Sequence, residues 1–262
     1  MKKIFYNSTI FALLIIVLIW SCEEKEKDIP GSITMRFEHR INHQPLIYDS
    51  LIYVNKAGNP FMVNEIQYFI SRLDFFKDGK AYHSLPDWNH YVDTDIESTW
   101  TWKLDNEFEL GDYDSIAFNF GFDDTDNASF MFTDPPECNM LWPEPLGGGY
   151  HYMKLNGKWQ TANGELKAFN FHMGRGQQYQ PDTAFIDNSF RVSLPGSAFN
   201  VSSNSKIEVI LTMNIENWFQ NPHTYNFDLV GGQIMQNQEA MNMGKENGQD
   251  VFSVEINKIL PE

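Results

Sequence analysis

Residues 139–157 read NMLWPEPLGGGYHYMKLNG, and after a short turn residues 169–174 read FNFHMG. A loop rich in proline and glycine therefore leads into two short segments in which apolar and polar residues alternate, as they do in half-buried strands. The stretch contains His151, His172 and three methionines. Imidazole nitrogens and thioether sulfurs are borderline-to-soft ligands that suit copper better than magnesium or calcium. Methionine and tryptophan are also common core residues, so the same pattern is compatible with a purely structural role.

The alternation of apolar and polar residues continues on both sides of this stretch. Residues 115–122 carry apolar side chains at every second position, which predicts a half-buried strand. Residues 214–219 predict one helical turn, and residues 233–245 predict a short amphipathic helix that ends at Gly248. Many short strands with turn signals and little helix indicate an all-β sandwich or barrel. The other strands that the pattern predicts are residues 32–41, 46–54, 63–76, 89–93, 189–194, 206–213 and 251–256.

The composition limits the classes of partner. The chain has 262 residues, enough to bury a sizeable core, and aromatic residues make up 15% of it. Its formal net charge is -16, and such a surface repels nucleic acid and anionic membranes. There are two cysteines, Cys22 and Cys138, which is too few for a disulfide framework. We therefore expect a folded β protein that binds no nucleic acid.

The N-terminus carries a targeting segment. Lys2 and Lys3 precede an apolar run over residues 10–20, which is too short for a spanning helix and ends at Ser21-Cys22. This resembles a bacterial lipobox, so we expect residues 1–21 to be a signal peptide and Cys22 to carry the lipid. The acidic residues 22–31 form a flexible tether and resemble a signal for export to the cell surface. The protein is thus expected to be an outer-membrane lipoprotein, periplasmic or surface-exposed, with residues 32–262 as one domain.

The order of the motifs resembles one known family over nearly the whole mature chain. The quoted stretch matches it at Met140-Leu141-Trp142, at the tripeptide Leu155-Asn156-Gly157 and at His172-Met173-Gly174. The other matching motifs are Phe37-Glu38-His39, Gln67-Tyr68-Phe69-Ile70-Ser71-Arg72-Leu73, His90-Tyr91-Val92-Asp93, Phe118 to Asp123 with Asn127, and Val251-Phe252-Ser253-Val254. With these residues the chain is similar to the MbnP-like proteins, a copper-binding family associated with methanobactin. The resemblance implies an antiparallel β-sandwich with one short C-terminal helix, long loops and a copper site.

The resemblance also implies ligands. In the family, copper is held by two histidines and by a kynurenine that forms oxidatively from tryptophan. His90, His172 and His39 match histidine positions of the family, and His90 and His172 are expected to lie near one site. His151 is an addition of this chain and is a further candidate ligand. A carboxylate such as Asp93 is expected to orient a ring nitrogen, as such groups often do beside metals.

The tryptophan of the implied site is Trp142, which matches the loop tryptophan of the family. A di-haem peroxidase-like partner is implied as its oxidant. Glu144 stands where the family has a second tryptophan, so this chain departs from the pattern at that position. The leading hypothesis is therefore an envelope lipoprotein that binds copper, in either oxidation state, for acquisition, storage or delivery.

Three alternatives stay open at the level of sequence. Calcium is the alternative cation, for the acidic loop at residues 123–127, although its spacing differs from an EF-hand and turn chemistry explains it first. A carbohydrate-binding or adhesion module without metal would use Trp88, Trp100 and Trp102, because aromatic faces stack on sugar rings. An enzyme would need a carboxylate pair, for which Glu137, Glu144 and Glu165 are near the central loop. No catalytic motif supports this interpretation, so we expect no enzymatic activity.

Overall fold

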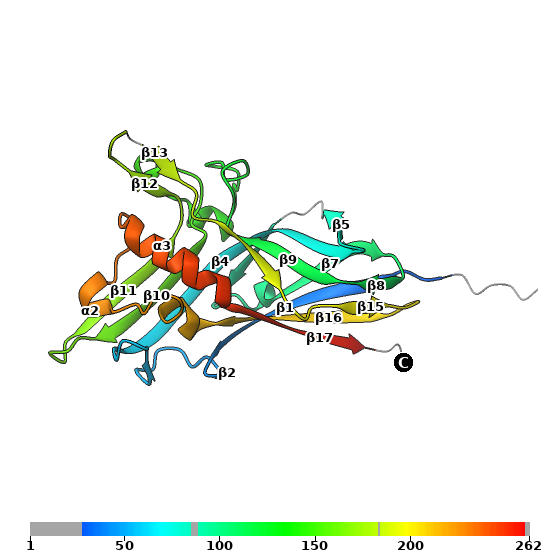
Figure 1. Ribbon diagram of the computed structural model, residues 1–262, viewed down its shortest axis with the longest axis horizontal. Helices are drawn as coiled ribbons and strands as arrows, with labels where there is room; N and C mark the ends of the chain where they lie inside the picture. The colour runs from blue at the N-terminus through cyan, green and yellow to red at the C-terminus, as the bar shows by residue number, and fades with distance from the viewer. Residues whose placement is uncertain (1–27, 85–88, 183, 260–262) are drawn as a thin grey trace, which may run out of the picture.

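Strand β4 (Pro60–Lys77) is the strand on which the larger sheet is built. A computed structural model of the chain describes residues 28–84, 89–182 and 184–259, and the expected all-β sandwich is confirmed (Figure 1). The larger sheet has the order β11-β10-β4-β9-β14, and three further strands pair with β4. The five strands on the path are β11 (Leu166–Met173), β10 (Met153–Gln160), β4, β9 (Ser115–Phe120) and β14 (Phe190–Leu194). The three further strands are β3 (Tyr53–Val54), β5 (Lys80–Ser84) and β6 (Asn89–Asp93).

The smaller sheet has the order β17-β16-β1-β2, with β7 also paired to β1. Its strands are β17 (Phe252–Ile259), β16 (Lys206–Asn214), β1 (Gly31–Ile41), β2 (Gln44–Pro45) and β7 (Thr101–Phe108). The pairing of β1 with β16 is parallel, whereas the other pairings within both sheets are antiparallel. Two small sheets pair β12 (Gly176–Gln178) with β13 (Ala184–Ile186) and β15 (Phe199–Val201) with β8 (Gly111–Tyr113).

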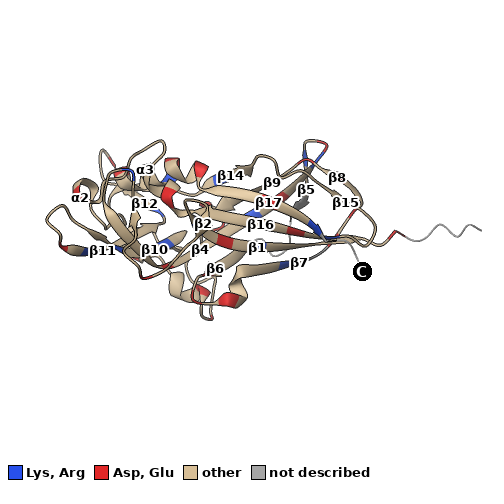
Figure 2. Ribbon diagram, turned by 90° about the horizontal axis from the view of Figure 1, so that it is seen from below, with Lys and Arg blue, Asp and Glu red and all other residues tan. Residues whose placement is uncertain are grey.

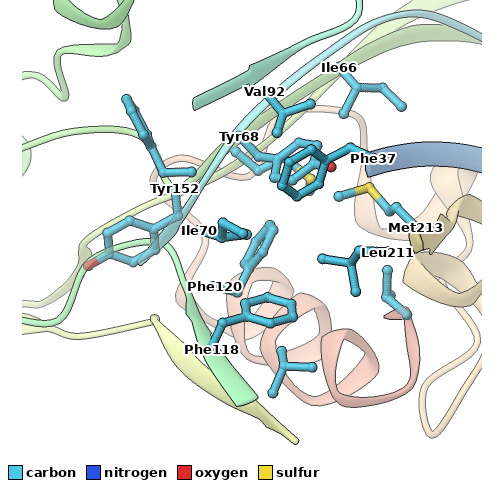
Figure 3. Packing of buried hydrophobic residues seen from close by; sticks show 14 of the residues in the cluster. Phe37, Ile66, Tyr68, Ile70, Val92, Phe118, Phe120, Tyr152, Leu211 and Met213 are labelled. Atoms are coloured by element: carbon cyan, nitrogen blue, oxygen red, sulfur yellow. The ribbon is translucent and has the colours of Figure 1, made fainter. Parts of the chain in front are cut away.

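The main core lies between the two sheets. From β1 and β16 the side chains of Phe37, Leu211 and Met213 point toward Tyr68 and Phe120 of the larger sheet (Figure 3). All five are at most 2% exposed. The face of the larger sheet that carries Tyr68 is therefore its inner face.

The other face of the larger sheet, its outer face, is also buried in part. Phe69 follows Tyr68 on β4 and is 0% exposed, because successive side chains of a strand point to opposite faces. The rings of Phe122, Phe132 and Tyr150 contact it within 6.3 Å between centroids. Residues 121–152, which connect β9 to β10, therefore cover this part of the outer face; we call this segment the covering loop. It contains the short 3-10 helices η2 (Glu137–Met140) and η3 (Glu144–Leu146).

The helices are few and short in the described residues. The predicted helical turn at residues 214–219 is the 3-10 helix η4 (Ile215–Phe219), and the predicted C-terminal helix is α3 (Gln238–Asn247). The other helices are α2 (Phe227–Val230), η1 (Glu97–Trp100) and η5 (Gly248–Asp250). None of the helices in the described ranges is long and apolar enough to cross a membrane. The signal peptide, Cys22 and most of the tether lie outside the described residues.

The strand predicted at residues 46–54 is wrong over most of its length. Only β3 forms within it, at its C-terminal end, and β2 lies just before it; Ile47, Leu51 and Ile52 between the two strands are exposed. The apolar residues there follow Pro45 and gain no neighbouring strand, so the alternating pattern has no ladder to join. β7 is the reverse case, because residues 101–108 read as a polar stretch and yet pair with β1.

Candidate metal centre

The covering loop brings Trp142 and His151 together. An isolated bridge joins Leu141 to Tyr150, Trp142 N donates to Gly149 O at 2.8 Å, and His151 N donates to Met140 O at 2.7 Å. The loop is thus closed by backbone hydrogen bonds at the residues that carry the two rings. The ring centroids of Trp142 and His151 are 4.7 Å apart, with the planes at 75°.

Trp142 is held from several sides. It is 0% exposed, and its indole Nε1 donates to Leu146 O at 3.1 Å. Gly174, just after β11, lies directly against the ring, because a Cβ at this position would be 2.6 Å from the indole atoms Cε3 and Cζ3. The glycine at 174 is therefore required by the close approach of the tryptophan.

His151 and His172 are neighbours. Their ring centroids are 5.2 Å apart and the planes lie at 82°. His151 Nδ1 lies 2.9 Å from Met140 O, and His172 Nε2 lies 2.8 Å from Asn156 Oδ1. Both acceptors are carbonyl oxygens, which carry no hydrogen, so each ring donates there and keeps its lone pair on the other nitrogen. The open nitrogens are His151 Nε2 and His172 Nδ1, and the latter is buried without a hydrogen-bond partner.

Both histidines are neutral at pH 7. Burial lowers the pKa of His151 to about 3, against the raising effect of the hydrogen bond to the Met140 carbonyl. Burial likewise lowers the pKa of His172 to about 4, and the positive charge of Lys154 adds to the effect. Neutral imidazole is the form that binds metals. Two neutral rings with open nitrogens, one of them an orphaned buried atom, fit a copper ion.

The cross-strand register separates this pair from His90. His172 pairs with Lys154, which pairs with Gln67, so the three side chains lie on the outer face. His90 pairs with Ile70, which shares the inner face with Tyr68 two residues earlier. The structure therefore does not bring His90 and His172 together at one site, contrary to the expectation from sequence.

His90 is enclosed by aromatic rings. Its ring stacks between Phe37 at 5.1 Å and Trp102 at 4.9 Å, and its Nε2 lies 2.8 Å from Thr99 O. Burial lowers its pKa. Trp102 and Trp100 are also engaged, the latter through a hydrogen bond from Nε1 to Asp93 O at 2.8 Å. These contacts give both tryptophans a structural role, whereas Trp88 lies outside the described residues.

His39 lies on the inner face of β1, edge-on to Tyr68 with 5.8 Å between the centroids. Its Nε2 is buried and has no hydrogen-bond partner, and burial lowers its pKa to about 4. The residue also lines a cavity of about 520 Å³. The other lining residues are Arg36, Phe37, Glu38, Arg40, Pro45, Leu46, Tyr48, Glu97, Trp100 and Thr101. His39 is therefore placed away from the Trp142–His151 contact, on the opposite side of the larger sheet.

The methionines of the central stretch are mostly core residues. Met153 pairs with both Met173 and Tyr68, so the two methionines share the inner face with the core. Met173 also packs beneath α3, because a Cβ on Gly244 would lie 2.8 Å from its sulfur. Met140 belongs to the covering loop, is 0% exposed and offers His151 its carbonyl oxygen.

The carboxylates have separate roles. Asp93 does not orient a histidine; its side chain accepts hydrogen bonds from Gln67 and Tyr91. Asp93, Asp95 and Glu65 form an acidic cluster with one oxygen from each within 4.8 Å of the others, and Figure 2 shows acidic residues gathered beside β6.

In the acidic loop that was the alternative calcium site, Asp123 and Asp126 form ion pairs with Arg72 at 2.9 and 2.6 Å. Turn chemistry and an arginine thus account for that loop.

The fold and these side chains define an all-β sandwich with a candidate histidine-based metal centre. The MbnP family model matches residues 30–240, and the chain belongs to the MbnP family. Among solved structures it is similar to "MbnP from Methylosinus trichosporium", with 12% sequence identity and a TM-score of 0.47. The match covers 87% of this chain and 99% of the other. None of the curated proteins matches the chain in sequence.

His151 and His172 were both among the four histidines expected as candidate ligands, but the pair singled out from the sequence was His90 with His172. Asn156 and Glu65 were not expected as partners of the site, although Asn156 stands in the quoted stretch, two residues after Lys154. The signal that was available is the alternation of β10, which places Lys154 and Asn156 on the same face.

Proposed function

We propose that the protein binds copper on the outer face of its larger sheet, through His151 Nε2 and His172 Nδ1 beside Trp142. Membership of the MbnP family supports a copper-related role. The observation that carries the proposal is the contact between two neutral imidazoles, each of which has one nitrogen hydrogen-bonded to an oxygen and the other open. Among the residues that the structure describes, His151 and His172 are the two histidines whose rings contact each other. Borderline nitrogen ligands suit copper in either oxidation state.

Trp142 is the third member of the proposed centre. The resemblance implies its oxidation to kynurenine by a di-haem peroxidase-like partner, which removes one carbon atom and adds one oxygen atom. The ring contacts His151 at 4.7 Å, so an oxygen introduced there would arise within the metal site. The protein is further proposed to act without catalysis, as an envelope lipoprotein that is anchored through lipid on Cys22 and acquires, stores or delivers the metal.

The experiment compares metal content after exposure to copper. The soluble protein that lacks residues 1–22 is purified beside the variants His151→Ala/His172→Ala and His223→Gln. The His223 side chain is 40% exposed and paired with Glu246, so its variant controls for adventitious binding to a histidine at the surface. We expect stoichiometric copper in the wild type and in His223→Gln, and none in the double variant.

Two results would contradict the proposal: a wild type that retains no copper, or a double variant that retains as much as the wild type. Intact mass spectrometry of the same samples, with peptides mapped to Trp142, tests the oxidation separately, because the conversion raises the mass of that residue.

A further inference from the structure

A chain of hydrogen bonds connects His172 to a carboxylate that does not contact it. His172 Nε2 lies 2.8 Å from Asn156 Oδ1, and Asn156 Nδ2 donates to Glu65 Oε2 at 2.9 Å. Asn156 of β10 is directly opposite Glu65 of β4 in the register, so the two backbones hold this pair together. All three side chains are on the outer face. We call Glu65 and Asn156 the relay.

The chemistry of the relay fixes its direction. An ionised carboxylate can only accept hydrogen bonds, so Glu65 faces the amide nitrogen of Asn156 and not its oxygen. The amide oxygen then faces His172 Nε2, which must donate. A neutral imidazole has a hydrogen on only one of its two nitrogens, so the lone pair of His172 is on Nδ1. Nδ1 is the atom that is buried without a partner and lies on a ring in contact with His151.

The surroundings keep Glu65 in this role. Its carboxylate lies within 4.8 Å of those of Asp93 and Asp95, and Lys154 is close enough for Glu65 and Asp93 to raise its pKa against the larger lowering effect of burial. Lys154 Nζ is itself held by Asn139 O at 2.8 Å, in the covering loop. The Glu65 carboxylate, on the side of Asn156 away from His172, is therefore part of a group of charged side chains beside the candidate centre.

We infer that Glu65 and Asn156 are positioning residues, which select the Nε2-protonated tautomer of His172 and so keep Nδ1 open for the metal. The effect on copper affinity rests on the proposed copper function. Residues that hydrogen-bond to a metal ligand typically change metal affinity by about 10- to 100-fold. The first half of the inference, the tautomer, concerns the metal-free protein alone.

Four variants separate the relay from a merely structural role. Asn156→Leu removes the acceptor. Glu65→Gln keeps the volume of the side chain. The new amide can either accept from Asn156 or donate to it, so the Asn156 amide is no longer held in one orientation. Glu65→Gln/Asn156→Asp exchanges amide and carboxylate, and the carboxylate introduced at position 156 can only accept from both neighbours. Asn170→Leu is the control, because Asn170 is opposite Asn156 on β11 but bonds to Gln233.

The first readout is the imidazole ¹⁵N spectrum of the metal-free protein, which reports the tautomer of each histidine. We expect Nε2-protonated His172 in the wild type, in the Asn170→Leu control and in the exchanged double variant. We expect mixed tautomers in Glu65→Gln and Asn156→Leu. The second readout is copper affinity by competition with a chelator, with a loss of about 10-fold or more in Asn156→Leu and recovery in the exchanged double variant.

The inference is overturned if Asn156→Leu matches Asn170→Leu in both readouts, or if the exchanged double variant is as weak as Asn156→Leu. A wild type that binds no copper while the tautomers behave as expected would overturn the copper function and the effect on affinity, but it would support the tautomer assignment. Circular dichroism of every variant shows whether the fold is retained.

Discussion

The substitution Gly174→Ala tests how tightly the sandwich holds Trp142. The added methyl carbon would lie 2.6 Å from Cε3 and Cζ3 of the indole, whereas carbon atoms pack best at about 3.5–4.0 Å. The ring has to retreat by about 1 Å. Its retreat is opposed by the hydrogen bond from Nε1 to Leu146 O and by the His151 ring at 4.7 Å. Gly174 cannot retreat freely either, because its carbonyl accepts from Asn188 at 3.0 Å.

Overpacking of this kind costs about 1–3 kcal/mol of stability. We expect Gly174→Ala to lower the free energy of unfolding by this amount. If His151 holds copper as proposed, the substitution should also weaken copper binding, since the displaced indole pushes against the His151 ring. Gly164→Ala is a control for an added methyl group without a clash, although its backbone, unlike that of Gly174, has a positive φ. Its methyl group meets no atom within 4 Å, so any cost there comes from the backbone at φ +82°.

The assay is urea unfolding of the metal-free protein in a double-mutant cycle with Trp142→Phe. The smaller phenyl ring leaves room for the methyl group, so we expect Gly174→Ala to cost less in that background, with a coupling of about 1 kcal/mol or more. An equal cost in both backgrounds would refute the reasoning, because the contact between residues 174 and 142 would then not be the source of the strain.

Two further predictions concern His39 and Cys22. The pKa of His39 is lowered to about 4 from an ordinary 6.5, so below pH 6.5 the unfolded chain binds a proton that the folded protein does not bind. Stability therefore falls as the pH falls from 6.5 toward 4, and His39→Leu should gain about 2 kcal/mol over the wild type between pH 7 and pH 5, measured by urea unfolding at both values; parallel pH profiles would contradict this. Cys22→Ala should abolish incorporation of a labelled fatty acid and release the protein from the membrane fraction, whereas labelling that survives the substitution would exclude Cys22 as the anchor.

The strands with a two-residue period were predictable because each has a buried face. Residues 32–41 and 206–213 alternate in the sequence and become β1 and β16, whose apolar side chains fill the core. Their parallel pairing was not predictable, since alternation gives a face but no partner or direction. The strand expected at residues 46–54 failed for a related reason, because a local pattern forms a strand only where a neighbour supplies hydrogen bonds.

The types of residue in the candidate centre were predictable, but which histidines lie together in it was not. The resemblance singled out His90 and His172, which the register places on opposite faces of one sheet. Which face a residue takes depends on where its strand begins and on any bulge, and a shift of one residue reverses the answer. His151 became the partner because the covering loop turns back through three glycines with positive φ, at positions 147–149, before β10 begins.

The four histidines named from the sequence differ most in the hydrogen bonds of their ring nitrogens. His39 has an unpartnered Nε2 in the inner core, and His90 donates to Thr99 between two stacked rings. His151 and His172 each donate to an oxygen, and their rings also touch. Burial makes an unpaired polar atom costly, and His172 Nδ1 is a buried nitrogen without a hydrogen-bond partner. A metal ion that accepts this lone pair would remove the cost, so at the proposed site the unpaired Nδ1 would favour binding of the metal.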